Sequence, residues 1–214
     1  MLTHLLNGGP IMVPLLLLSI LALAVIIDRL RAFHLADVNT LKLRSEINDC
    51  LYEDRVDDAI RACEASSGPV AAVMLAGLIK YRKLLVLGRP SNEIEVAVSK
   101  TMEDYAPQVL EGLEKRLNLL TLIGSFSPLL GMTGTVTGMI KSFDTMAQAA
   151  GLDAGAVAGG ISEALITTAA GLLVAMPAVA AANLFGKRVD KYILEIDEFI
   201  IDMVDFISLR QDQA

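Results

Sequence analysis

The chain has 214 residues, of which 54% are hydrophobic and 20% are charged. Soluble globular domains contain fewer apolar and more charged residues, so this composition argues against an ordinary soluble protein and favours apolar segments in lipid joined by charged segments in water. The formal net charge of −7 argues against a nucleic-acid partner, because a surface that meets phosphates needs a basic stripe.

Residues 11–27 form the first apolar run and predict a transmembrane helix. The apolar core of a bilayer is about 30 Å thick and requires about 20 helical residues, with about 17–25 tolerated. No Lys or Arg lies in residues 1–10, and no small-x-small cleavage site stands directly before Asp28. A secretory signal needs both features, so we expect a retained membrane anchor.

Residues 28–116 predict a helical region outside the membrane. Apolar residues recur at helical spacing over 28–51 and are expected to extend the first span. A short helix over 55–65 ends at Ser-Ser-Gly-Pro, and another over 70–87 ends at Gly-Arg-Pro. The next helix starts at Ser91, and Pro107 predicts a kink or a break within it, because proline lacks the N–H that a helix interior needs.

Two further apolar runs predict a second span over 117–140 and a third over 161–185. Both are long enough to cross the bilayer, and neither has the charged face of a soluble amphipathic helix. They leave 141–160 as a loop and 186–214 as a C-terminal segment, whose apolar residues recur at spacings of three and four among acids. That pattern predicts an amphipathic helix. The expected fold is an all-α membrane protein with three transmembrane helices and long helical cytoplasmic extensions.

The distribution of Lys and Arg predicts the direction of the spans. Thirteen of these residues lie between the first and second spans, one lies between the second and third, and four follow the third. The positive-inside rule makes the heavily basic side cytoplasmic. We therefore expect a multi-pass membrane protein whose N-terminus faces outward and whose C-terminus is cytoplasmic.

Nothing in the sequence predicts catalysis. Cys50 and Cys63 lack the spacing of a metal site or a disulfide framework and are expected to be buried thiols. The glycines at 131, 134 and 138 do not have the spacing of a dinucleotide fingerprint, and no GK[ST] motif is present. The spans contain no His to serve as a base for a serine nucleophile. We expect no enzyme activity, no cofactor and no metal.

Small and hydroxyl-bearing residues form one stripe on each of the last two spans. At about 100° per residue, the stripe of the second span contains Thr121, Gly124, Ser125, Pro128, Gly131 and Thr135. In the third span, Thr168 and Gly171 belong to a stripe of small residues, and Thr167 shares a neighbouring face with Glu163. Such stripes allow close helix packing, and the hydroxyls can also line a polar path, so both roles stay open for these residues.

Glu163 is an acid within the third span. An ionisable group in a span is costly and usually faces a cavity or a partner. It lies shortly after Gly159-Gly160, so the alternative is a first-turn acid favoured by the helix dipole at the membrane surface. Position alone does not separate these two interpretations.

At these residues the chain resembles a known family. PLLGMTGTVTGMIKSF in the second span and GGISEALITTAAGLLVAMPAVAAANLF in the third closely resemble the ExbB/TolQ branch of the MotA/TolQ/ExbB proton-channel family. The opening GGPIMVPLLLLSILALAVIIDRL is also similar to that family's first span, so the resemblance covers nearly the whole chain. The motor-type MotA branch fits less well, because it has four spans.

The resemblance implies a homo-oligomeric ring, a homo-pentamer, around a dimer of a single-span partner of the ExbD/TolR type that brings the membrane aspartate. It implies that Thr135, Glu163 and Thr168 line the central pore and that the chain is the channel or stator subunit of a motor driven by the proton motive force. That motor would energise transport or envelope work at the outer membrane, and an envelope-spanning effector of the TonB type is a further candidate partner.

Two other functions compete with this interpretation. A passive helical membrane scaffold would use the same small residues for packing alone. A secondary transporter is disfavoured, because three spans are few and no inverted repeat is visible. A scaffold tolerates the loss of the threonine hydroxyls, whereas a channel does not.

Overall fold

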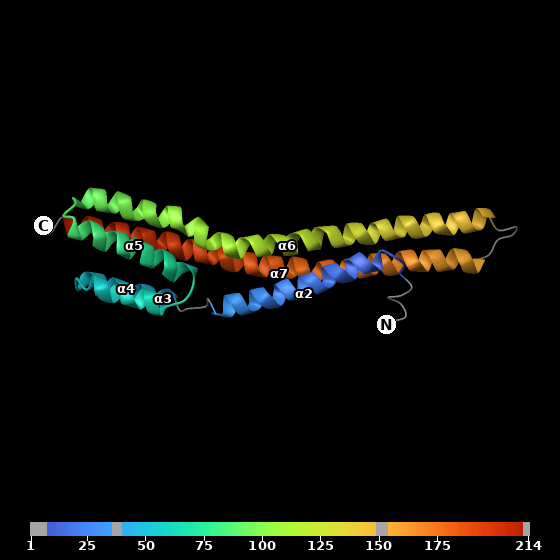
Figure 1. The fold of residues 1–214 in the computed structure, drawn as a ribbon, viewed down its shortest axis with the longest axis horizontal. Helices are drawn as coiled ribbons and strands as arrows, with labels where there is room; N and C mark the ends of the chain where they lie inside the picture. The colour runs from blue at the N-terminus through green and yellow to red at the C-terminus, as the bar shows by residue number, and fades with distance from the viewer. Residues whose placement is uncertain (1–7, 36–39, 149–153, 212–214) are drawn as a thin grey trace. The chain divides into compact units, whose positions relative to one another are not determined.

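The computed structural model describes residues 8–35, 40–148 and 154–211, and the element labels follow Figure 1. The helices are α2 (Met12–Leu35), α3 (Thr40–Tyr52), α4 (Val56–Ala65), α5 (Pro69–Val86), α6 (Ser91–Gln148) and α7 (Ala154–Gln211). Within those described ranges there is no strand. α2, α6 and α7 are long and apolar enough to cross a membrane. The prediction of an all-α fold with three such helices is confirmed.

The helices run beyond the segments assigned to the bilayer. α6 continues to Gln148 and α7 begins at Ala154, so most of the 141–160 segment is helical and residues 149–153 lie outside the described part. In the N-terminal segment 1–10, only Gly8, Gly9 and Pro10 are described, and residues 212–214 of the C-terminal segment are not. Apolar length sets where a span can lie, but it does not mark where a helix ends in water.

The helix α6 is not broken at Pro107. The sequence predicts a kink or a break at this proline. The helix is continuous through it, so the break does not occur. Met102 and Leu110, which lie before and after the proline, are both buried. Their packing holds both sides of the helix in place while the proline removes one backbone hydrogen bond.

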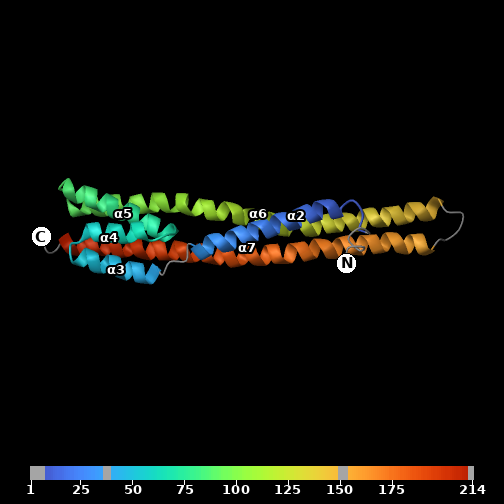
Figure 2. The same ribbon diagram turned by 60° about the horizontal axis from the view of Figure 1, so that its bottom comes forward.

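The chain divides into two compact units, and each is described separately. The membrane unit consists of residues 1–29 and 116–185, and the extramembrane unit consists of 30–115 and 186–214. In the membrane unit, α2 lies alongside the paired segments of α6 and α7 in both views (Figures 1 and 2). Leu15 and Ala22 of α2 are buried there.

The extramembrane unit packs the short helices α3, α4 and α5 with the polar ends of α6 and α7 (Figures 1 and 2). Its core holds large side chains that are almost fully inaccessible, including Phe33, Ile47, Met74, Tyr81, Phe199 and Met203. α5 starts with Pro69 after Gly68, which has a φ of 122°. Proline suits the first helical position because its missing N–H has no partner there in any case.

Cys50 and Cys63 are free, buried thiols, as predicted. Burial raises the pKa of Cys63 to about 12, and it also raises the pKa of Cys50. Because the thiolate is the reactive form, both side chains serve as small apolar packing groups in the extramembrane unit.

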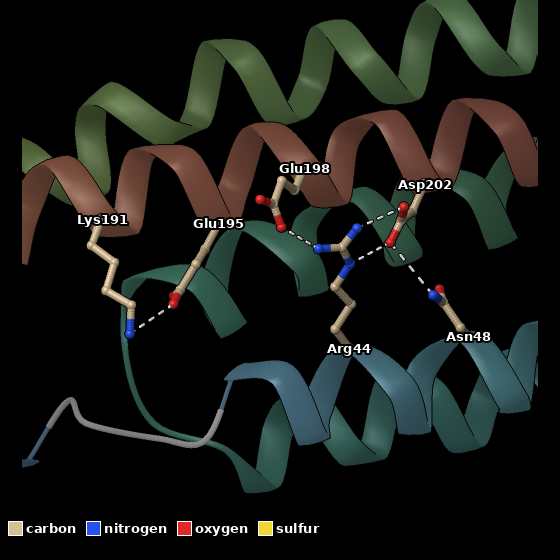
Figure 3. Close-up of polar contacts among 6 residues, drawn as sticks. All are labelled: Arg44, Asn48, Lys191, Glu195, Glu198 and Asp202. Atoms are coloured by element: carbon tan, nitrogen blue, oxygen red, sulfur yellow. Dashed lines mark hydrogen bonds and ion pairs between the residues drawn. The ribbon is translucent and has the colours of Figure 1, made fainter.

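Arg44 joins α3 to α7 across the extramembrane unit (Figure 3). Its guanidinium donates to both carboxylate oxygens of Asp202, with 2.8 Å between Nη2 and Oδ1, and to Glu198. Asn48, one turn further along α3, also donates to Asp202 at 3.4 Å. The hydrogen bond from Arg44 lowers the pKa of Asp202, and the bond to Asp202 raises the pKa of Arg44. A bidentate pair of this kind fixes direction as well as distance.

Replacing Asp202 by asparagine is expected to make the unit less stable at neutral pH. Hydrogen bonds to charged groups contribute about 1.5–3 kcal/mol each, and the change leaves Arg44 without its bidentate acceptor. The folded pKa of Asp202 lies below its unfolded value of about 3.9. The stabilisation is therefore present above that value and is lost as the pH falls through the folded pKa.

The measurement is the midpoint of thermal unfolding of the full chain in detergent between pH 7 and pH 2. The difference between wild type and Asp202→Asn should be largest at neutral pH and should shrink in acid. Asp205→Asn, at an exposed acid on the same helix, is the matched control. Equal midpoints for Asp202→Asn and Asp205→Asn at pH 7 would refute the role of the Arg44 bridge.

Candidate functional site

Glycines bring α6 and α7 into close contact within the membrane unit. A Cβ atom on Gly131 would lie 3.0 Å from Cα of Thr168, and one on Gly171 would lie 2.5 Å from the carbonyl oxygen of Ser127. Any larger residue at these positions would push one backbone away from the other. We call this contact the α6–α7 seam; it is formed by Ser127, Gly131, Gly134, Gly138, Gly160, Ala164, Thr167 and Gly171.

Two threonines of α7 lie at the seam. Thr168 donates from Oγ1 to the carbonyl oxygen of Gly131 on α6 at 3.1 Å, so this hydroxyl bridges the two helices. Thr167 is 1% exposed and donates to the carbonyl oxygen of Ala164 within its own helix at 2.8 Å. It fills the space over Gly134 of α6. Thr167 is therefore a packing residue, whereas Thr168 lies at the edge of the seam.

The α6 residues that the sequence singled out as a polar stripe lie to one side of the seam. Relative to Gly131, the positions of Thr135, Pro128, Thr121 and Ser125 fall within about 120° in one direction around the helix. Thr135 donates to the carbonyl oxygen of Met132 at 2.6 Å, and Ser125 donates to that of Thr121 at 3.0 Å. Thr121 and Ser125 are exposed, and Thr135 and Pro128 are partly exposed. Each of these two hydroxyls, on Thr135 and Ser125, donates its hydrogen to a carbonyl oxygen of its own helix, and its oxygen can still accept a hydrogen bond from another group.

The helix α2 lies along the opposite side of the seam. An apolar groove of about 530 Å³ lies between it and α6. Its walls come from Pro14, Leu17, Leu18 and Leu21 of α2 and from Leu119, Leu122, Ile123, Phe126 and Leu130 of α6. Ile123, Phe126 and Leu130 fall on the other side of Gly131 from Thr135, at about 100° per residue. Thr121, Ser125 and Thr135 therefore do not lie on the side of α6 along which α2 runs.

Glu163 lies on the α2 side of α7. Its carboxylate oxygen Oε2 accepts a bond from Nζ of Lys141 at 2.9 Å, and Gly9, just before α2, packs against the same carboxylate. Thr168 follows Glu163 by five positions, a rotation of about 500°, which leaves the two side chains about 140° apart. Within one chain, Thr135 and Thr168 thus flank the seam on one side, and Glu163 points to the other.

The helix boundary removes one interpretation of Glu163. α7 begins at Ala154, more than two turns earlier, so Glu163 is not a first-turn acid. Lys141 and Gly9 were not recognised as its partners from the sequence. The sequence could have indicated Lys141 as the partner, because it is the one basic residue between the second and third predicted spans. Among the residues that the structure describes, no group of three potential metal ligands lies together.

Charged residues gather at one end of the membrane unit. Asp28 of α2 accepts bonds from the adjacent Arg29 at 2.7 Å and from Arg116 of α6 at 2.5 Å. These residues follow the apolar part of α2 and precede that of α6. Asp28, Arg29 and Arg116 thus form a charged group at one end of the apolar stretches, and Lys141 with Glu163 forms a second one near the other ends of α6 and α7.

Comparison with known proteins places the chain in a family. Residues 66–198 match the MotA/TolQ/ExbB proton channel family. A protein of Synechocystis sp. named biopolymer transport protein ExbB-like 3 is 34% identical over 83% of this chain and 81% of its own length. The biopolymer transport protein ExbB of Neisseria meningitidis is 27% identical over 92% of both chains.

A TolQ sequence is similar over a shorter stretch. The Tol-Pal system protein TolQ of Pseudomonas aeruginosa is 35% identical over 64% of this chain and 63% of its own length. The family match over residues 66–198 includes the α6–α7 seam and the second and third apolar runs. The chain therefore belongs to the MotA/TolQ/ExbB proton channel family, in its ExbB/TolQ branch, and is a multi-pass inner-membrane protein.

Proposed function

We propose that the chain is the channel or stator subunit of an inner-membrane motor driven by the proton motive force. The motor energises a single-span partner of the ExbD/TolR type and, through it, transport or envelope work at the outer membrane. The observation that carries this proposal is that Thr135 and Thr168 lie on the side of the α6–α7 seam away from α2. It gains weight because the chain belongs to a proton channel family. An envelope-spanning effector of the TonB type is proposed as a further partner.

A single copy cannot enclose a path for protons. The backbone and polar groups must be shielded from hydrocarbon, and one hydroxyl stripe has lipid on its open side. A closed ring of identical subunits, proposed here as a pentamer, brings Thr135 and Thr168 of each copy to a common axis. A dimer of the single-span partner occupies that axis and brings a membrane carboxyl. The Glu163 carboxylate lies on the α2 side of its own chain, away from Thr168, so we propose that it adds negative charge near the outer mouth of the ring and not on the axis beside Thr168.

The energy for the work comes from the proton gradient. One proton crossing a potential of 100 mV releases about 2.3 kcal/mol. Threonine hydroxyls both donate and accept, so they can hold water or the partner's carboxyl without forming a permanent ion pair. We place the Asp28–Arg116 group on the cytoplasmic side and the Lys141–Glu163 group on the periplasmic side, because basic residues concentrate around the first of these groups. The N-terminus is then periplasmic and the C-terminus cytoplasmic.

Purification from native membranes tests the proposal against the passive scaffold. An affinity-tagged full chain should carry with it a small single-span protein that contains one membrane aspartate. Proteoliposomes that hold both proteins should acidify internally when a potassium diffusion potential, negative inside, is imposed, as reported by an enclosed pH-sensitive dye. The chain reconstituted alone is the control. Proton flux that is no larger with the partner than without it would favour the scaffold.

A further inference from the structure

Three elements meet at the Glu163 carboxylate. Glu163 comes from α7, Lys141 comes from the end of the apolar part of α6, and Gly9 comes from the turn before α2. The side chain of Glu163 is 20% exposed, and that of Lys141 is 69% exposed. The ammonium group therefore reaches from the surface to a carboxylate that is largely covered by the protein.

The turn before α2 is shaped to fit this carboxylate. Gly9 has a φ of +69°, and a Cβ atom on it would lie 3.1 Å from Cδ of Glu163 and overlap Oε1. A non-glycine residue would be strained by its backbone and would also displace the carboxylate. Met12, the first residue of α2, donates its N–H to the carbonyl oxygen of Gly9 at 3.2 Å, so the position of Gly9 sets where α2 begins.

We infer that Lys141 and Gly9 are positioning residues for Glu163, and that this three-element clasp ties the start of α2 to the α6–α7 pair. Lys141 draws the carboxylate to the α2 side, away from the side of Thr168, and Gly9 leaves room for it. A lone charge at the edge of the apolar layer is costly, and a charge-assisted hydrogen bond offsets that cost. The consequence for activity rests on the proposed function, whereas the contact itself does not.

A zero-length cross-link tests the contact without any activity. A water-soluble carbodiimide converts the Glu163 carboxylate into an O-acylisourea. The Lys141 amine then attacks its acyl carbon, an amide forms, and the reagent leaves as the urea with the elements of water. In the full chain in native membranes, peptide mass spectrometry should find Lys141 joined to Glu163. The Lys191–Glu195 pair, at 3.3 Å in the extramembrane unit (Figure 3), is the internal positive control.

The variants make the cross-link specific. Lys141→Arg keeps the charge but removes the reactive amine, so the cross-link should vanish. Gly9→Ala should lower its yield, because the new Cβ displaces the carboxylate. A sample in which Lys191 is joined to Glu195 but Lys141 is not joined to Glu163 would overturn the clasp, whatever the protein's activity.

Charge exchange tests the role of the clasp in function. Lys141→Glu and Glu163→Lys should each lower partner-dependent proton flux, the double exchange should recover it, and Lys141→Arg should retain it. The recovery should be at least about tenfold, within the range for two residues in direct contact. Full flux in Lys141→Met, or no recovery in the double exchange, would overturn the positioning role. If Thr135→Val and Thr168→Val kept full flux, the proposed pore would be refuted. The cross-link would still show whether Lys141 contacts Glu163.

Discussion

Thr135→Val and Thr168→Val are each expected to abolish proton-driven work while the protein still assembles and enters the membrane. Valine keeps the shape of threonine but removes the hydroxyl, so Thr168 loses its bond to Gly131 and Thr135 loses its polar atom at the seam edge. The loss of partner-dependent flux should be on the order of a hundredfold, as when one preorganised hydrogen-bonding group is removed from a reaction path. Serine at either position should restore flux, because it restores the hydroxyl.

Thr133→Val is the matched control for this result. Thr133 donates to the carbonyl oxygen of Leu130 at 2.7 Å, the same local bond that Thr135 makes to Met132. It lies about 200° around α6 from Gly131 and so points away from the seam. Its loss should leave flux unchanged. If Thr133→Val were as damaging as Thr135→Val, the hydroxyl would matter for the helix and not for a path.

Gly171→Ala is expected to open the α6–α7 seam. The added methyl group would lie 2.5 Å from the carbonyl oxygen of Ser127 and 3.2 Å from Cα of Gly131, and neither backbone atom can move without its helix. Overpacking of this kind costs about 1–3 kcal/mol, and each kcal/mol lowers the unfolding midpoint of a chain of this length by roughly 2–4 °C. The measurement is thermal unfolding of the purified protein in detergent.

Gly159→Ala provides the comparison on the same helix. A Cβ at Gly159 would meet no atom within 4 Å, and alanine favours a helix over glycine by up to about 1 kcal/mol. This variant should be as stable as the wild type or more stable. A Gly171→Ala protein that unfolds at the same temperature as Gly159→Ala would show that the seam is looser than the structure has it.

Much of the fold follows from local features of the sequence. A run of apolar residues long enough to cross lipid is recognisable without knowing its neighbours, because the bilayer is the partner of each span. The buried state of Cys50 and Cys63 and the start of α6 at Ser91 also agree with the sequence patterns. At Pro107 backbone chemistry alone leaves a kink or a break open, and packing on both sides of the proline keeps α6 continuous.

The candidate site divides in the same way. The spacing of Gly131, Thr135 and Thr168 was enough to select these positions, because small and hydroxyl residues at helical intervals form one stripe on any helix. It did not separate packing from pore lining. That distinction needs the face on which α2 lies, and α2 is at least a hundred residues from Thr135 in the chain.

The amino-acid sequence alone therefore determines the three apolar helices, the small-residue stripes and the family, since each depends on length, periodicity or a contiguous motif. The tertiary structure was needed to show that Thr168 bonds to Gly131, that Arg44 bonds to Asp202 and that Lys141 and Gly9 hold Glu163. These contacts join residues from 22 to more than 150 positions apart. Periodicity gives the face of a single helix, but the rotation of one helix against another is set by packing, which no local pattern records.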